Sequence, residues 1–145
     1  MYLLDTNVVS ELRKVTRGRA DPNFAAWAAS VESESLYVSA ITIQELEIGV
    51  LLAERRDPSA GAVLRYWLDR QVFEAFDRRI LPVDSQVALR AAALHIPDPA
   101  PVQDALIAAT ALTHRMKVVT RNTRHFERFH PLHILDPWKQ RIAKS

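Results

Sequence analysis

Three acidic residues, Asp5, Glu45 and Asp104, lie in apolar sequence surroundings that suit a carboxylate poorly. Asp5 follows the apolar run 2–4, and on helices Glu45 and Asp104 would have isoleucine, leucine and alanine as neighbours. A buried carboxylate is costly unless it is paired, hydrogen-bonded or neutralised. Three that converge would also repel, by about 4 kcal/mol per pair at ~4 Å in an effective dielectric of roughly 20. A hard divalent cation removes both costs, so the sequence predicts a metal-dependent enzyme in which these three residues converge.

Each acid also has an ordinary structural interpretation. Asp5 stands where an aspartate is favoured as a helix N-cap. Glu45 could be an exposed or hydrogen-bonded glutamate, and Asp104 could be a first-turn carboxylate favoured by the helix dipole. Because Asp98-Pro99 offers an earlier cap, Asp104 is expected further inside its helix. Each acidic residue alone is therefore ambiguous, and the prediction of a metal site rests on the three of them occurring in this order along the chain.

Rival chemistries have little support in the sequence. The chain has only three glycines, none in a phosphate-binding loop, and no Gly-x-Ser-x-Gly motif of a serine hydrolase. The absence of cysteine excludes disulfides and thiolate zinc sites. A zinc site formed by His125, His130 and His133 is conceivable, but their spacing fits no standard signature.

Length and composition predict one globular domain covering residues 1–145, with 48% hydrophobic residues. No apolar run approaches the roughly 20 residues of a membrane span, and the N-terminus lacks the pattern of a signal peptide. A cytoplasmic protein without a membrane partner is therefore expected. Residues 1–113 contain 11 Lys/Arg and 15 Asp/Glu, whereas residues 114–145 contain 8 and 2. This asymmetry permits a polyanionic partner, although a solvated surface explains it equally well.

Short β-type runs alternate with helical patterns, which is typical of an α/β fold with a mostly parallel sheet covered on both faces. The expected strands are 2–4, 36–39, 80–83, 117–120 and 133–135, and the expected helices lie near 6–14, 22–31, 42–55, 60–79, 85–95 and 102–115. Asp21-Pro22 and Asp57-Pro58 resemble helix N-caps. The apolar stripe in segment 60–79 fits either core packing or an interface.

Four stretches together resemble the PIN-domain family, and within it the VapC-type toxins of bacterial toxin–antitoxin pairs. They are Leu3–Leu12, Ser39–Gly49, Asp104–Leu112 and Val118–Phe126, in family order. The resemblance implies a three-layer α/β sandwich with a central, mostly parallel sheet of about four to five strands flanked by helices. It also implies Mg²⁺- or Mn²⁺-dependent endoribonuclease activity, homodimerisation, and neutralisation by a small cognate antitoxin.

By position, the resemblance makes Asp5, Glu45 and Asp104 the first three acids of the family site, with catalytic and metal-binding roles. Supporting contacts are expected from Thr6, Asn7, Thr120 and Asn122, with Thr6 and Asn7 orienting Asp5 or a bound water. The basic residues after the fourth strand are candidates to grip RNA phosphates: Arg121, Arg124, His125 and Arg128.

The fourth acid of the family is missing. Relatives often place a carboxylate where this chain has Asn122 or His125, and Glu127 is out of register. Because of this difference, the sequence does not decide whether the site binds one metal ion or two. Two alternative functions also remain: a DNA or junction nuclease that uses the same site, and a catalytically weak protein that binds nucleic acid or antitoxin.

Overall fold

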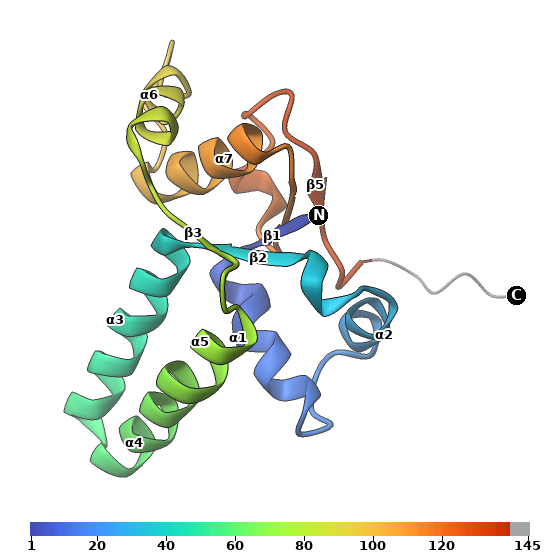
Figure 1. Ribbon diagram of the computed structural model, residues 1–145, viewed down its shortest axis with the longest axis vertical. Coiled ribbons are helices and arrows are strands. Elements are labelled where there is room, and N and C mark those ends of the chain that lie inside the picture. The colour runs from blue at the N-terminus through green and yellow to red at the C-terminus, as the bar shows by residue number, and fades with distance from the viewer. Residues whose placement is uncertain (140–145) are drawn as a thin grey trace, which may run out of the picture.

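Five short parallel strands form one sheet in the order β3-β2-β1-β4-β5. The computed structural model describes residues 1–139 and is drawn in Figure 1. The strands are β1 (Tyr2–Leu4), β2 (Leu36–Ser39), β3 (Ile80–Leu81), β4 (Lys117–Val119) and β5 (Ile134–Leu135). The helices are α1 (Thr6–Val15), α2 (Pro22–Ser30), α3 (Ala40–Arg56), α4 (Pro58–Tyr66), α5 (Phe73–Ala75), α6 (Ser85–Ala93) and α7 (Val102–His114). Short turns of other helix types are η1 (Ser33–Ser35), η2 (Trp67–Val72) and η3 (Thr123–His125).

Strand β1 is the centre of the sheet. Leu4 pairs with Val38 of β2 on one side and with Val119 of β4 on the other. The chain first adds β2 and β3 on one side of β1, and only later adds β4 and β5 on the other side. The strand order therefore reverses between β1 and β4. In open parallel sheets a crevice forms outside the carboxyl ends of the strands at such a reversal.

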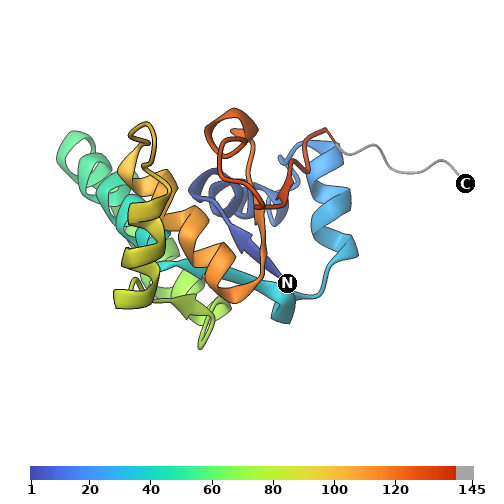
Figure 2. The ribbon, with the colours of Figure 1, turned by 90° about the horizontal axis from the view of Figure 1, so that it is seen from above.

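Successive side chains of the central strands enter two cores because they point to opposite faces of the sheet. Leu4 and Val119 belong to a core with residues of α1, α2 and α3, whereas Leu3 and Val118 pack with residues of α7. Helices α1 to α5 cover one face and α7 the other, and α6 packs on α7 (Figure 1). Seen from above, α2 and α3 lie at opposite ends of the molecule (Figure 2). The predicted three-layer sandwich with a parallel sheet is confirmed.

The expected helix starts at Asp21 and Asp57 are confirmed. The Asp21 carboxylate accepts hydrogen bonds from the backbone N–H groups of residues 23 and 24, and Asp57 does the same for residues 59 and 60. A proline follows each aspartate, where its missing N–H costs nothing.

The expected start of α7 near residue 102 is confirmed, but the earlier cap expected at Asp98 is wrong. The helix begins at Val102, so Asp104 lies in its first turn rather than further inside. Pro99 and Pro101 explain the difference, because a residue that precedes proline is pushed out of helical conformation. Residues 98 and 100 therefore cannot start the helix, and it begins as soon as the prolines end.

The apolar segment 60–79 lies mostly in one continuous helical run. This run begins at Pro58, contains the π-helical stretch η2 and ends at Ala75, four residues before the expected end. Its buried side chains, Leu68, Val72 and Phe76, belong to the core against α1 and α2, whereas Val63 and Phe73 are exposed. Core packing therefore explains the inner half of the stripe. Within residues 1–139, the structure contains no helix that is long and apolar enough to span a membrane.

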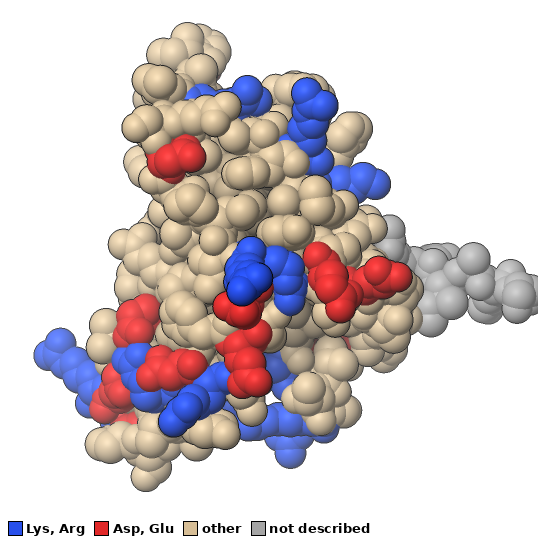
Figure 3. Space-filling model, in the orientation of Figure 1, with Lys and Arg blue, Asp and Glu red and all other residues tan. Residues whose placement is uncertain are grey.

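Helices α3 and α4 form a tight hairpin. A Cβ atom at Gly61 would meet the backbone of Glu54, only 2.7 Å from its nitrogen, so only glycine permits this approach. On the outer side, the Arg65 guanidinium bridges Glu47, Glu54 and Asp69. Figure 3 shows charged side chains of both signs gathered over this hairpin.

Replacing Gly61 by alanine should separate α3 from α4, because the added methyl group meets backbone rather than a flexible side chain. Overpacking of this kind costs about 1–3 kcal/mol of unfolding free energy. Gly49→Ala is the matched control: a Cβ there meets nothing within 4 Å. Alanine at a helix interior should raise stability by roughly 0.5–1 kcal/mol. Urea unfolding of both variants measures the difference, and equal effects would contradict the close approach.

Candidate active site

Asp5 lies at the junction of β1 and α1, at the point where the strand order reverses. Its backbone N–H donates to the Val119 carbonyl at 2.9 Å, which continues the pairing of β1 with β4. Its carboxylate caps α1 by accepting the Thr6 N–H at 2.8 Å. The second carboxylate oxygen accepts the Thr120 hydroxyl at 2.7 Å and the Asn7 amide at 3.2 Å. The buried carboxylate is thus held in one orientation.

The segment after β4 is tied to the start of α1. Thr120 is fully buried, and its hydroxyl also accepts the backbone N–H of Asn122 at 3.0 Å. The Asn7 side-chain oxygen accepts the backbone N–H of Arg121 at 3.1 Å. Asn7 and Thr120 therefore lie against Asp5, whereas Asn122 reaches it only through Thr120.

Glu45 reaches the same place from α3, which begins directly after β2 with Ser39 as its N-cap. The Thr6 hydroxyl donates to a Glu45 carboxylate oxygen at 2.9 Å. The sequence predicted that Thr6 orients Asp5 or a bound water by a hydrogen bond. In the structure the backbone N–H of Thr6 donates to Asp5, and its hydroxyl donates to Glu45, a contact that the sequence did not predict.

Asp104 completes the group from the first turn of α7. The imidazole Nδ1 of His125, in η3, lies 3.6 Å from an Asp104 carboxylate oxygen. The His125 side chain is 58% exposed and that of Asp104 20%, so the pair faces solvent on the histidine side.

Burial and mutual repulsion shape the electrostatics. Burial raises the pKa of Glu45 above its ordinary value; the Thr6 hydrogen bond opposes this rise, and the charges of Asp5 and Asp104 add to it. Burial also raises the pKa of Asp104, with His125 lowering it and Asp5 raising it. Thr6 links Asp5 to Glu45 by hydrogen bonds, and the charges of Asp5 and Asp104 both act on Glu45, as expected of neighbouring carboxylates.

The three carboxylates do not form a complete set of metal ligands in this conformation. In the part of the chain that the structure describes, no three His, Cys, Asp or Glu side chains are arranged to hold one ion directly. Oxygen ligands with accumulated negative charge are nevertheless the donor set of a hard divalent cation. Mg²⁺ usually keeps several waters and takes only one or two carboxylates, so the residues present fit such an ion.

The PIN domain family matches residues 2–130. The chain belongs to the PIN-domain family. This PIN domain is 38% identical over 144 residues to the VapC ribonuclease Y4jK of Sinorhizobium fredii, covering 96% of this chain and 99% of that protein. It is 36% identical over 143 residues to toxin FitB of Neisseria gonorrhoeae, covering 95% and 99%.

Solved structures agree with these relatives. The crystal structure of FitAcB from Neisseria gonorrhoeae has a TM-score of 0.84 and 34% identity, covering 97% of this chain and 100% of that chain. The structure of FitAB bound to an IR36 DNA fragment has a TM-score of 0.81 and 32% identity, covering 99% and 100%. The family resemblance of the four sequence stretches is therefore confirmed.

The four basic residues that were predicted to bind RNA phosphates make different contacts in this PIN domain. The Arg121 guanidinium lies over the indole ring of Trp138, 5.3 Å from its centroid, and Arg124 is exposed. Arg128 donates to backbone carbonyl groups of the loop between α6 and α7. Of the four predicted phosphate-binding residues, only His125 is seen in contact with one of the three acids.

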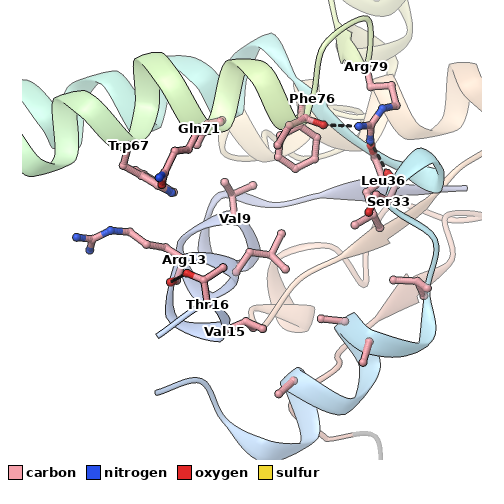
Figure 4. A pocket seen from close by; sticks show the side chains of 17 residues that line it. Val9, Arg13, Val15, Thr16, Ser33, Leu36, Trp67, Gln71, Phe76 and Arg79 are labelled. Atoms are coloured by element: carbon pink, nitrogen blue, oxygen red, sulfur yellow. Dashed lines mark hydrogen bonds between the residues drawn. The ribbon is translucent and has the colours of Figure 1, made fainter. Parts of the chain in front are cut away.

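A separate apolar groove of about 570 Å³ opens between α1, α2 and the segment 67–79 (Figure 4). Its walls include Val9, Leu12, Leu36, Val72 and Phe76. The sequence reasoning did not find this groove. The available signal was the alanine-rich helix α2, whose small side chains leave space beside α1.

Two arginines line the groove. Arg79 donates to the carbonyl groups of Ser33, Leu36 and Ala75, so its guanidinium is committed to the backbone. Arg13 lies 5.9 Å from the Trp67 ring, and its Nε is buried without a hydrogen-bond partner among residues 1–139. Burial lowers the pKa of Arg13, and Arg17 lowers it further.

The raised pKa of Glu45 predicts a measurable pH dependence of stability in the metal-free protein. The folded chain binds the Glu45 proton more tightly than the unfolded chain, so folding loses stability as pH rises through the raised pKa. Glu45→Gln removes that ionisation and keeps an acceptor for Thr6. The variant should be more stable than the wild type at pH 8, and this advantage should shrink as pH falls toward the ordinary glutamate pKa of about 4.3.

Urea unfolding at pH 8 and pH 5, with chelator present, measures the difference. An advantage of Glu45→Gln that stays constant or grows at the lower pH would contradict the raised pKa.

Proposed function

We propose that this PIN domain is a divalent-metal-dependent endoribonuclease toxin that a small antitoxin restrains. One observation carries the proposal: Thr6 joins Asp5 to Glu45, and burial together with the charges of neighbouring carboxylates raises the pKa of Glu45 and Asp104. The relatives named VapC ribonuclease and toxin FitB support the same conclusion.

Asp5, Glu45 and Asp104 would hold Mg²⁺ or Mn²⁺. When bound, such an ion activates a water for attack on a phosphodiester and stabilises negative charge on the phosphate. The chain itself supplies orientation. Thr120 and Asn7 fix the Asp5 carboxylate, and Thr6 fixes Glu45.

The region of the missing acid is occupied by His125, beside Asp104, and by Asn122, whose backbone N–H binds Thr120. Neither side chain adds negative charge, so we propose one ion at this site rather than two. The exposed imidazole of His125 can donate to a substrate phosphate from this position.

RNA would approach over the segment 121–125. A guanidinium stacked on an indole keeps its N–H edge free for phosphate, so Arg121 on Trp138 is a preorganised candidate. Arg124 is exposed beside it. Contacts of this kind position the backbone without reading sequence. The activity belongs in the cytoplasm, where the RNA is.

Asp5→Asn should abolish RNA cleavage, with a loss of at least about 100-fold, because the substitution removes ligand charge but keeps side-chain shape. Circular dichroism should show an intact fold. Asp77→Asn, the same change at an exposed residue away from the site, is the matched control and should cleave as the wild type does. Activity should disappear with chelator and return with Mg²⁺.

Matched RNA and DNA strands and analysis of the product ends complete this test. A water nucleophile predicts 5′-phosphate and 3′-hydroxyl ends. Cleavage of DNA but not RNA would show that the protein is a DNA nuclease instead. Full activity of Asp5→Asn at limiting Mg²⁺ would remove Asp5 from the site.

We further propose that the apolar groove between α1 and α2 receives a segment of the antitoxin. An exposed apolar hollow of this size suits the apolar face of a helix or an extended peptide. The Nε of Arg13, which has no hydrogen-bond partner among residues 1–139, favours a segment that also carries an acidic side chain.

Ala29 lines the groove and is exposed, so Ala29→Glu would place a charge in the groove without disturbing the core. This variant should bind the small protein encoded by the adjacent gene at least about tenfold more weakly, because the added carboxylate occupies the apolar groove and competes with the acidic side chain of the antitoxin for Arg13. Ala62→Glu on the exposed side of α4 is the control. Calorimetry on purified proteins measures both, and equal affinities would move the antitoxin elsewhere.

Homodimerisation remains part of the proposal. Ile48, Leu51 and Leu52 on α3 are 45%, 53% and 58% exposed, and apolar surface of this kind often marks an interface. Light scattering of the purified chain determines the oligomeric state.

A further inference from the structure

The Arg128 guanidinium binds one loop at three points. It donates to the carbonyl groups of Leu94, at 3.5 Å, Pro99, at 3.0 Å, and Asp98. It also lies 5.7 Å from the centroid of the Phe129 ring. A planar fork with five donors can hold several carbonyl groups at once, which an ammonium group cannot reproduce.

The loop that Arg128 holds sets the start of α7. It runs from the end of α6 to Pro101, which precedes α7 without a side-chain cap. A further side-chain bond within this loop comes from His95, whose Nδ1 accepts the Ala100 N–H at 3.0 Å. Because the first turn of α7 has no side-chain cap, the contacts of this loop help to fix that turn, whereas buried residues fix the rest of the helix.

Arg128 also belongs to the segment that presents His125. Phe126 and Phe129, which flank it, are 1% exposed and share a core with Ala100 and Ala105. His125 precedes this pair and lies 3.6 Å from Asp104. The Arg128 side chain thus connects the segment that contains His125 to the loop that precedes α7, the helix that contains Asp104.

We infer that Arg128 is a positioning residue that fixes loop 94–101 and thereby sets where α7 presents Asp104 beside His125. This role is an alternative to the phosphate contact that the sequence predicted for Arg128. The catalytic part of this inference rests on the proposed ribonuclease function, whereas the loop-fixing part does not.

Two substitutions separate positioning from phosphate binding. Arg128→Lys keeps the charge and loses the fork, whereas Arg128→Gln loses both. Positioning predicts that both variants lower kcat by about 10- to 100-fold, since displacements near 1 Å can cost that much. KM for RNA and its salt dependence should stay at wild-type values. Arg90→Lys and Arg90→Gln, at an exposed residue of α6, are the matched controls and should leave both constants unchanged.

Hydrogen exchange provides a readout that needs no catalysis. In Arg128→Gln, amides of loop 94–101 and of the first turn of α7 should exchange faster, whereas those of α1 and α3 should not change. Thermal melting should confirm that each variant folds.

Three outcomes would overturn the inference. The first is exchange that matches the wild type throughout loop 94–101. The second is a higher KM with a salt slope reduced by about one and kcat unchanged, which is the pattern of a phosphate contact. The third is recovery of wild-type kcat by lysine. If the wild type cleaves no RNA, the proposed function fails, while faster exchange in Arg128→Gln still supports the positioning role.

Discussion

The hydrogen bond from the Thr120 hydroxyl to the Asp5 carboxylate joins the ends of the two strands between which the sheet reverses its order. Asp5 is also the last residue paired with β4 and the cap of α1. A strand end, a helix start and a site carboxylate are therefore set by one residue. Glu45 depends on the same junction, because the Thr6 hydroxyl that holds it belongs to the first residue of α1.

The donors around Asp5 are a backbone amide, a hydroxyl and a side-chain amide. All three are neutral, so they orient the carboxylate without cancelling its charge. A lysine or arginine at this place would stabilise the metal-free chain but would compete with a cation for the same oxygens. The cost of the arrangement appears in Glu45 and Asp104, where burial and the neighbouring carboxylates raise the pKa.

Much of the fold follows from sequence patterns. Short apolar runs gave the strands, and the Asp-Pro pairs at 21–22 and 57–58 gave two helix starts. The start of α7 near residue 102 was predicted as well, whereas the cap expected at Asp98 was wrong, because backbone restrictions imposed by two later prolines prevailed. The π-helical turn η2 has no signature in its residue pattern.

The predicted site residues differ in how far local sequence could place them. Asp5 is positioned by elements adjacent to it in the chain. The partner of the Thr6 hydroxyl is 39 residues away, and the carbonyl groups that hold Arg128 are about 30 residues away. Such contacts depend on how distant helices and loops pack, and no local spacing encodes them. The groove was missed for the same reason, since its walls come from three separate segments.

Helix α1 belongs to two surfaces. Its N-terminal end carries Thr6 and is capped by Asp5, while Val9, Leu12 and Arg13 on its next turns line the apolar groove. At a rise of 1.5 Å per residue, about 12 Å of helix separates Asp5 from Arg13. A helix this short moves as a rigid body, so a tilt imposed on its middle is transmitted to its first turn. Binding of a ligand in the groove would therefore affect binding of an ion at the carboxylates through this helix, although the two sites share no atom.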